Sequence, residues 1–427
     1  MNPTPLSDMQ RSMLAHEALE ELPIYTMPLA FEVTGPVDPD LLERALHHVI
    51  RRHPVLRARY DGTDAHDLGD GAPLPPLVRP AASAAPGLAP ALAAFLNTPF
   101  DLSREVPVRA ALAATGPDRH QLALAVHHIA GDSISLALLL RELGAAYTAL
   151  SREGRPPHAP PAADFFAHAR AEQQDSGPAA ADWWAERLSG IRPQPFPRRI
   201  PPPEADRCTL ISRDLGLDAD DTAGVRELAR TAEVSPAAVL FAAVSHAIAE
   251  PGATETVIGL PTALRDRPEL GAAMGPLLNT LPVRTPLAPG ATAAGAVRTH
   301  AAAIEESLAR KDLPYSRIVR AAGIRRSFDA APLFLHLVNI DCEPLRLRLD
   351  RARCTLLPVP RTWVVFPAHW EFGWGLVGNL CGELRLSADA FTDDHADTLA
   401  GRFRQALDGL LTDLPQGRVM TTTSKDA

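Results

Sequence analysis

The chain has 427 residues, of which 46% are hydrophobic and 22% charged, so it is long enough for two or three domains with sizeable cores. Its net charge is −9 and its basic residues are scattered, which argues against nucleic acid as a partner. No apolar run reaches membrane-spanning length, no leader pattern opens the chain, and the four cysteines are widely spaced. These features predict a cytoplasmic protein with free thiols and no membrane contact.

Two helix starts can be read near the N-terminus. Residues 5–10 read PLSDMQ, in which Ser7 and Gln10 have the spacing of a capping box. Asp38 and Pro39 supply the cap and the first-turn proline of a second helix. This helix is expected to end within residues 52–57 (RHPVLR), because a proline drives the residue before it out of the helical conformation.

The most informative segment is residues 122–133, which read LALAVHHIAGDS. Alternation along a strand places His128 on the face of the leucines and His127 on the opposite face, so the two histidines have different tasks. Asp132 follows four residues after His128. Apolar residues at helical spacing then predict a helix over Ile134–Leu150, for which Asp132 is a candidate cap.

This segment resembles the HHxxxDG signature of the condensation domains of nonribosomal peptide synthetases, whose superfamily includes chloramphenicol acetyltransferase. The match is HHIAGDS, residues 127–133, with Ser133 in place of the final glycine. The resemblance implies that His128 is catalytic and that His127 and Asp132 support the site. It also implies that Asp132 pairs with an arginine and that Gly131 and Ser133 line a substrate tunnel.

Other segments resemble further elements of the same family, and they follow one another in the family's order from residue 5 to about residue 340. Arg265 occupies the position of the family's characteristic arginine, which would pair with Asp132. Asn279 lies in a GxFxNT-like element and is assigned to the substrate tunnel. The matching segments are residues 5–10, 52–57, 164–166, 183–188, 258–265, 275–280, 311–315 and 329–334.

Predicted strands and helices alternate in both halves, which favours α/β layers. The resemblance implies two chloramphenicol acetyltransferase-like lobes, arranged as a V-shaped pseudo-dimer around a central tunnel. A polar stretch near residue 177 separates an N-terminal lobe, 1–177, which carries the histidine motif, from a C-terminal lobe, 178–427. Crossover segments between the lobes are expected near 259–284 and 363–384.

A histidine near neutral pKa can accept a proton from an attacking amine or alcohol, or orient it. The resemblance implies a donor acyl or aminoacyl group carried as a thioester on the phosphopantetheine of a carrier protein. The product would be an amide or an ester, and the acceptor would be free or carrier-bound. The sequence has no HExxH, Cys/His or nucleotide-binding motif, so neither a metal nor a cofactor bound by the protein itself is expected.

Three functions remain open at this point. The first is a free-standing condensation enzyme that meets acyl- or peptidyl-carrier proteins in trans, because no carrier-protein or adenylation motif is present. The second is epimerisation of a carrier-bound aminoacyl group, since epimerases share the histidine pair. The third is a catalytically degenerate domain that recruits a partner, an alternative suggested by Ser133.

Overall fold

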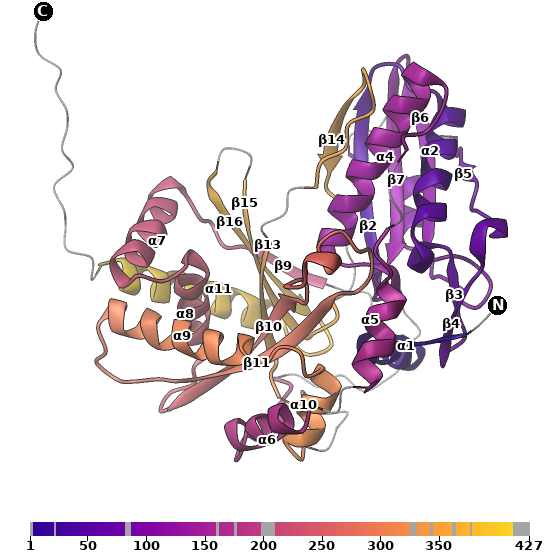
Figure 1. Ribbon diagram of the computed structural model, residues 1–427. Helices are drawn as coiled ribbons and strands as arrows, with labels where there is room; N and C mark the ends of the chain where they lie inside the picture. Colours follow the sequence, from indigo (N-terminus) through magenta and orange to yellow (C-terminus); the bar gives the residue numbers. More distant parts are fainter. Residues whose placement is uncertain are drawn as a thin grey trace, which may run out of the picture.

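The protein is described by a computed structural model that covers residues 3–20, 23–81, 87–158, 162–174, 177–197, 210–324, 330–331, 333–341, 345–360, 364–375 and 378–412. Two main sheets carry the fold, each with helices on its faces. The two layered bodies stand as the arms of a V (Figure 1). The fold is therefore mixed α/β, with two lobes in a V as the family resemblance implies.

The N-terminal sheet has its strands in the order β14-β2-β7-β6-β5, with α2 (Pro39–Arg52) and α4 (Ser133–Glu153) on one face. Leu122 and Leu124 of β7 pack against these two helices. Ala123 and Ala125 face the shorter helix α3 (Pro90–Leu96), which packs closely because these side chains are small. The strands are β2 (Thr26–Thr34), β5 (Leu77–Val78), β6 (Val108–Gly116), β7 (Arg119–His127) and β14 (Arg353–Leu357).

The C-terminal sheet has its strands in the order β11-β10-β13-β15-β16-β9. Its strand β13 is buried on both faces, since Leu337 packs in the cluster around Trp184 and Val338 packs against the helices of the opposite face. Double burial explains the nearly continuous apolar run around this strand. The strands are β9 (Leu210–Asp214), β10 (Glu255–Ala263), β11 (Leu278–Pro286), β13 (His336–Asp341), β15 (Ala368–Trp374) and β16 (Leu380–Ser387).

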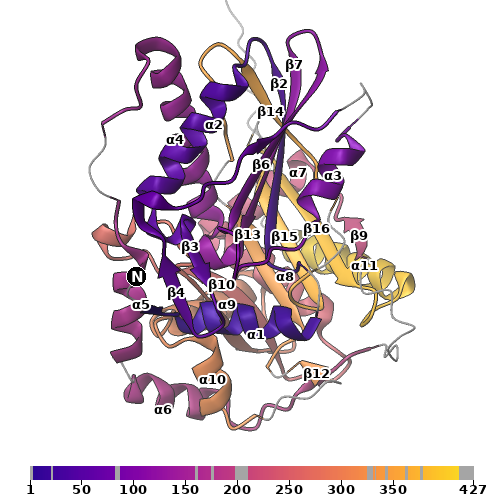
Figure 2. The same cartoon turned by 90° about the vertical axis from the view of Figure 1, so that its right-hand side faces the viewer.

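Helices cover both faces of this second sheet (Figures 1 and 2). One face carries α7 (Ala219–Ala232), α8 (Pro236–Ile248), α9 (Ala293–Leu308) and α11 (Asp393–Thr412). The other carries α6 (Pro178–Arg187) and α10 (Tyr315–Ala321). The remaining α-helices and strands are α1 (Asp8–Glu20), α5 (Phe165–Gln174), the small sheet of β1 (Thr4–Pro5), β3 (Ala58–Tyr60) and β4 (Asp64–Asp67), and the pair β8 (Gln194–Pro195) and β12 (Ala330–Ala331).

The first predicted crossover is present in the connection between β10 and β11, within the expected range 259–284. Leu270, Met274 and Leu277 of this loop belong to the hydrophobic core of the N-terminal lobe, although the flanking strands lie in the C-terminal sheet. The loop therefore fastens one lobe to the other through buried apolar contact.

The second crossing lies earlier in the chain than the predicted range 363–384. Strand β14 leaves the C-terminal half and pairs with β2, from Arg353 opposite Thr34 to Leu357 opposite Ala30. Most of residues 364–384 instead forms β15 and β16, which pair with each other inside the C-terminal sheet, and residue 363 lies outside the described residues. The apolar side chains that alternate along β15 and β16 are buried against α11, which makes these strands part of the core.

The predicted lobe boundary at residue 177 falls between two helices that pack on different bodies. Phe165 and Phe166 of α5 lie in the N-terminal core, whereas Trp184 of α6 packs with α10 in the second half. Residues 413–427 of the predicted C-terminal lobe lie outside the described residues.

Two expectations concern the surroundings of the protein rather than its fold. By length and composition α4 is apolar enough to cross a membrane, which the sequence analysis did not expect, but 56% of its most apolar window is buried inside the protein. Helices α7 and α8 pass the same test only as a pair bent by 106°. Cys354 and Cys381 are free thiols, and Cys208 and Cys342 lie outside the described residues.

Candidate functional site

The histidine pair lies where β7 turns into α4. Strand β7 ends at His127, and His128 opens a short 3₁₀ turn, His128–Ala130, which replaces the predicted last strand residue. Helix α4 begins at Ser133 with Asp132 as its N-cap. The strand is one residue shorter than expected because the His127 ring caps the turn, with its Nδ1 accepting from the Ile129 N–H.

The His127 ring is completely buried and both of its nitrogens are used. Nε2 lies 2.8 Å from the Glu17 carboxylate on α1, and Nδ1 accepts a 3.0 Å hydrogen bond from the Ile129 N–H. This arrangement requires the proton on Nε2, which donates to Glu17. His127 is therefore placed to hold the turn rather than to reach a substrate.

The His128 side chain is only half-buried. Its backbone N–H donates to the Tyr25 carbonyl over 2.7 Å, and its ring stands edge-on to Tyr25. Nδ1 is buried without a hydrogen-bond partner among the described residues, whereas Nε2 is not buried. Burial lowers the pKa of His128 below its usual value, and the nearby Asp132 carboxylate opposes this shift. The ring is thus neutral near pH 7 and can accept a proton at Nε2.

Asp132 and Arg265 form a buried ion pair, which joins the N-terminal lobe to the β10–β11 crossover loop. Arg265 Nη2 lies 2.8 and 3.0 Å from the two carboxylate oxygens. Each side chain is 7% exposed. Arg265 Nη1 also donates to the carbonyls of Leu270 and Ala273, so the guanidinium shapes the crossover loop as well. The pair implied by the family resemblance is present.

Ser135 completes this cluster, and sequence reasoning missed it. Its hydroxyl lies 2.8 Å from Asp132 Oδ1 and 3.0 Å from Arg265 Nη2, and its backbone N–H donates to Asp132 Oδ1 over 2.7 Å. The same hydroxyl accepts from the Gly275 N–H over 3.2 Å. The only signal in the sequence is its place three residues after the cap, where a capping side chain finds its backbone partner.

Glycines pack tightly around Ser135. A Cβ on Gly131 would lie 2.9 Å from the Ser135 Cβ, so a side chain there is excluded by packing. Gly275 has φ +152°, and its Cβ would overlap the ring of Phe165 from α5. Two family-like elements, at residues 164–166 and 275–280, therefore meet at this cluster. Gly131 is buried beside Ser135, whereas it was assigned to a tunnel from the sequence.

The other two predicted tunnel residues differ from each other. Ser133 is exposed as the first residue of α4, and the cap is the Asp132 side chain, not the Ser133 hydroxyl. Asn279 is 2% exposed, and its amide nitrogen donates to the carbonyls of Lys311 and Leu313 over 2.7 Å each. Its amide oxygen accepts from two backbone N–H groups. Asn279 is thus fully occupied in holding a loop, rather than facing a substrate.

The element at residues 5–10 also contributes to the histidine turn. Ser7 and Gln10 form the reciprocal bonds of the predicted capping box, over 3.1 and 3.2 Å. The Gln10 amide additionally donates to the Ile129 carbonyl over 2.9 Å, which the sequence analysis did not foresee. Helix α1 therefore supports the turn at two places, through Gln10 and through Glu17.

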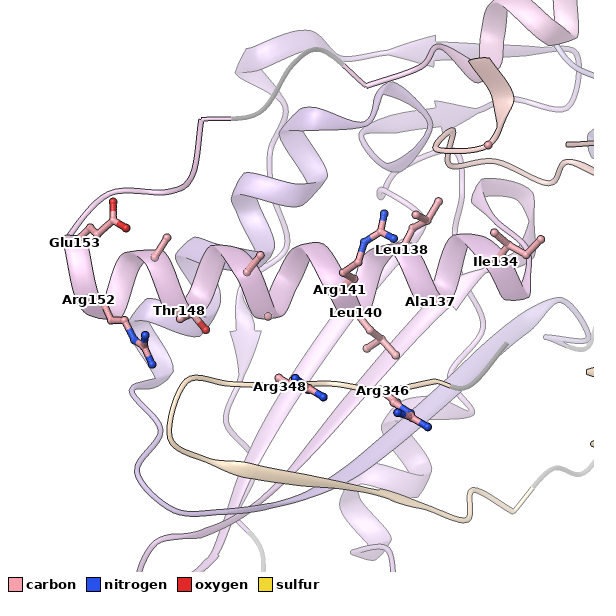
Figure 3. A pocket seen from close by; sticks show the side chains of 14 residues that line it. Ile134, Ala137, Leu138, Leu140, Arg141, Thr148, Arg152, Glu153, Arg346 and Arg348 are labelled. Atoms are coloured by element: carbon pink, nitrogen blue, oxygen red, sulfur yellow. The ribbon is translucent and has the colours of Figure 1, made fainter. Parts of the chain in front are cut away.

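Within the described ranges, no group of three or more His, Cys, Asp or Glu side chains could hold a metal ion. A groove of about 820 Å³ lies along α4, and its lining residues do not include His128 (Figure 3). The central tunnel implied by the resemblance stays a prediction.

The sequence matches a family model described as a condensation domain over residues 2–350. Phosphinothricin tripeptide synthetase PhsC of Streptomyces viridochromogenes is 32% identical over 352 residues, which cover 78% of this chain and 32% of that protein. A dimodular nonribosomal peptide synthase of Bacillus subtilis is 29% identical, over 96% of this chain and 18% of that protein. The chain thus spans about a third or less of the length of these relatives.

Solved structures give the same fold. The X-domain from teicoplanin biosynthesis, in complex with OxyB, superposes with a TM-score of 0.84 at 26% identity and covers 97% of this chain and 94% of that one. The first condensation domain of the calcium-dependent antibiotic synthetase, in complex with a substrate analogue, gives a TM-score of 0.78 at 20% identity, with 97% of each chain covered. This second likeness concerns the fold alone.

Proposed function

Because the chain belongs to the condensation-domain family of nonribosomal peptide synthetases, we propose that it is a condensation enzyme. It transfers an acyl or aminoacyl group from a carrier-protein phosphopantetheine thioester to an amine or alcohol and forms an amide or ester. The observation that carries the proposal is the His128 ring, which is neutral near pH 7 and presents an unburied Nε2 on a turn fixed from several sides.

In the proposed reaction, Nε2 of His128 accepts or orients the proton of the attacking N–H or O–H group. The new C–N or C–O bond forms at the thioester carbonyl carbon, and the C–S bond breaks. The released sulfur takes up one proton, so the proton lost by the nucleophile is returned to the leaving thiol. A thioester is already activated, and no covalent enzyme intermediate is needed.

Asp132 takes no part in this proton transfer, because its carboxylate is occupied by structural hydrogen bonds. Its carboxylate accepts from Arg265, the Ser135 hydroxyl and the Ser135 N–H, which leaves it engaged in structure. Its task is to fix the start of α4 and the crossover loop behind His128. Charge-assisted hydrogen bonds of this kind are strong and directional, so they hold the turn in one geometry.

Recruitment of a partner without catalysis is the second candidate. It is favoured by the likeness to the teicoplanin X-domain, a structure solved in complex with OxyB. The serine at position 133, where the family signature has glycine, points the same way. Serine adds a side chain beside the histidine turn that glycine lacks.

The two candidates are separated by incubating the protein with acyl-loaded carrier proteins, supplied as separate chains, and a panel of amines and alcohols. Mass spectrometry should detect a new amide or ester. Exchange of α-deuterium without an adduct would instead indicate epimerisation. If neither an adduct nor deuterium exchange is detected, the result supports recruitment. If only Ser133→Gly forms an adduct, the natural protein is a degenerate member.

The decisive variant is His128→Ala, which should lower turnover on the order of a hundredfold or more. The matched control is His48→Ala, another half-buried histidine, on α2. The control should turn over like the wild type. A near-wild-type rate for His128→Ala would remove His128 from the mechanism.

A further inference from the structure

A short extended segment, residues 345–349, lies along the flank of α4 before β14 begins; we refer to it as the strap. It reads LRLRL, and its Leu347 and Leu349 are buried in the N-terminal core. The alternation leaves Arg346 and Arg348 exposed on the outer side. The strap backbone passes so close to α4 that a Cβ on Gly144 would overlap the Arg348 carbonyl.

The strap and α4 together form the groove of about 820 Å³ (Figure 3). Apolar side chains of α4, among them Ile134, Ala137 and Leu138, line the groove. Arginines lie on both its sides, with Arg346 and Arg348 on the strap and further arginines on α4. The complete lining is Ile134, Ala137, Leu138, Leu140, Arg141, Gly144, Ala145, Thr148, Ala149, Arg152, Glu153, Gly271, Arg346 and Arg348.

The positive charge of this groove contrasts with the net charge of the whole chain, which is −9. Arg141, Arg346 and Arg348 are exposed and form no ion pair with a carboxylate of the described residues. Arginines elsewhere are commonly paired, as Arg404 is with Asp221. Inside the groove, Arg152 is paired with an aspartate, and Glu153 lies 3.9 Å from an arginine. The groove therefore carries an excess of unneutralised positive charge.

We propose that this groove is a docking surface for an acidic, amphipathic helix of the carrier protein. Apolar side chains of such a helix would cover the apolar lining, and its carboxylates would pair with the guanidinium groups in bidentate fashion. The stretch of α4 from Ile134 to Arg152 extends about 27 Å at 1.5 Å per residue, enough for several turns of a partner helix. The inference rests on the proposed function, because it assigns a surface to the carrier.

The position of the groove agrees with this occupant. Helix α4 begins directly after Asp132, so the groove starts next to the histidine turn and runs away from it. A carrier docked here would hold its attached group on the same side of the lobe as the start of α4. Positive charge around such a surface also speeds the encounter with an acidic partner at low salt.

Binding is measured by fluorescence anisotropy with a holo-carrier protein labelled at its C-terminus, on the full chain. The double variant Arg346→Glu/Arg348→Glu should raise Kd about tenfold or more. Arg141→Glu, on the α4 side of the groove, should weaken binding in the same direction. The wild-type affinity should fall with added salt, and that of the double variant should depend less on salt.

The matched control is Arg230→Glu/Arg402→Glu, which changes net charge by the same amount on α7 and α11 of the other lobe. It should bind the carrier like the wild type. An equal loss in both double variants, or no loss in the groove variant with its melting curve intact, would overturn the proposal. Because anisotropy needs no turnover, it tests the groove even where no condensation product forms.

Discussion

Replacing Asp132 by asparagine tests the cluster behind His128 most directly. Asparagine caps a helix as well as aspartate does, so the start of α4 keeps its cap while the charge is lost. Arg265 would then remain in a site where it is 7% exposed, with two backbone carbonyls but no carboxylate. Removing one partner of a buried ion pair costs about 3–5 kcal/mol, because the other charge stays uncompensated.

We therefore expect Asp132→Asn to lower the free energy of unfolding by about 3 kcal/mol. Asp132→Ala should lower it by about 1 kcal/mol more, the usual value of a lost cap. Urea unfolding followed by circular dichroism measures both. The control is Asp218→Asn, which changes an exposed N-cap aspartate on α7 whose side chain accepts only from the Asp221 N–H among the described contacts.

The control should be nearly neutral. If Asp132→Asn unfolds at the same urea concentration as Asp218→Asn, the pair with Arg265 contributes nothing to stability, and Asp132 is only a helix cap. If Asp132→Asn is destabilised as expected and its remaining folded fraction turns over normally, the cluster stabilises the fold without positioning His128.

Three further predictions follow from buried groups. His127→Ala should lower the free energy of unfolding by about 2–4 kcal/mol in urea, because a buried hydrogen bond to a carboxylate and ring packing are lost; an unchanged midpoint would contradict its role in the turn. Gly275→Ala should cost at least about 3 kcal/mol in the same assay because of overlap with an aromatic ring. The control Gly290→Ala, at φ +76° with no atom near its Cβ, should lower the free energy of unfolding by only about 1 kcal/mol. An equal loss of stability in the Gly275 and Gly290 variants would refute the packing argument. Burial lowers the pKa of His300 to about 4, below the value of 6.5 in the unfolded chain. The neutral His300 therefore contributes its full stabilisation above pH 6.5. As the pH falls toward 4, the free energy of unfolding decreases by about 3 kcal/mol. His300→Leu should flatten the stability profile between these pH values, and an unchanged slope would show that His300 does not cause it.

The sequence carried the features that depend on neighbours along the chain. The capping box of Ser7 and Gln10, the cap at Asp38 and the start of α4 after Asp132 are set by residues a few positions apart. The alternation in residues 122–127 correctly separated a leucine face from an alanine face. Even the pair of Asp132 and Arg265 could be expected, although only through a family resemblance and not through any pattern that links the two positions.

Other features were decided only when distant segments packed together. The Ser135 hydroxyl meets Gly275 across 140 residues, and the Gln10 amide reaches Ile129 across 119 residues. No local pattern encodes such partners, because a short polar side chain finds whichever donor or acceptor the folded core brings to it. The alternating sequence of the strap is compatible with an edge position in either lobe. Its place along α4 depends on Gly144, because a side chain there would overlap the Arg348 carbonyl. Local periodicity fixes which face of an element is apolar, but only the three-dimensional packing of those faces decides which residues meet.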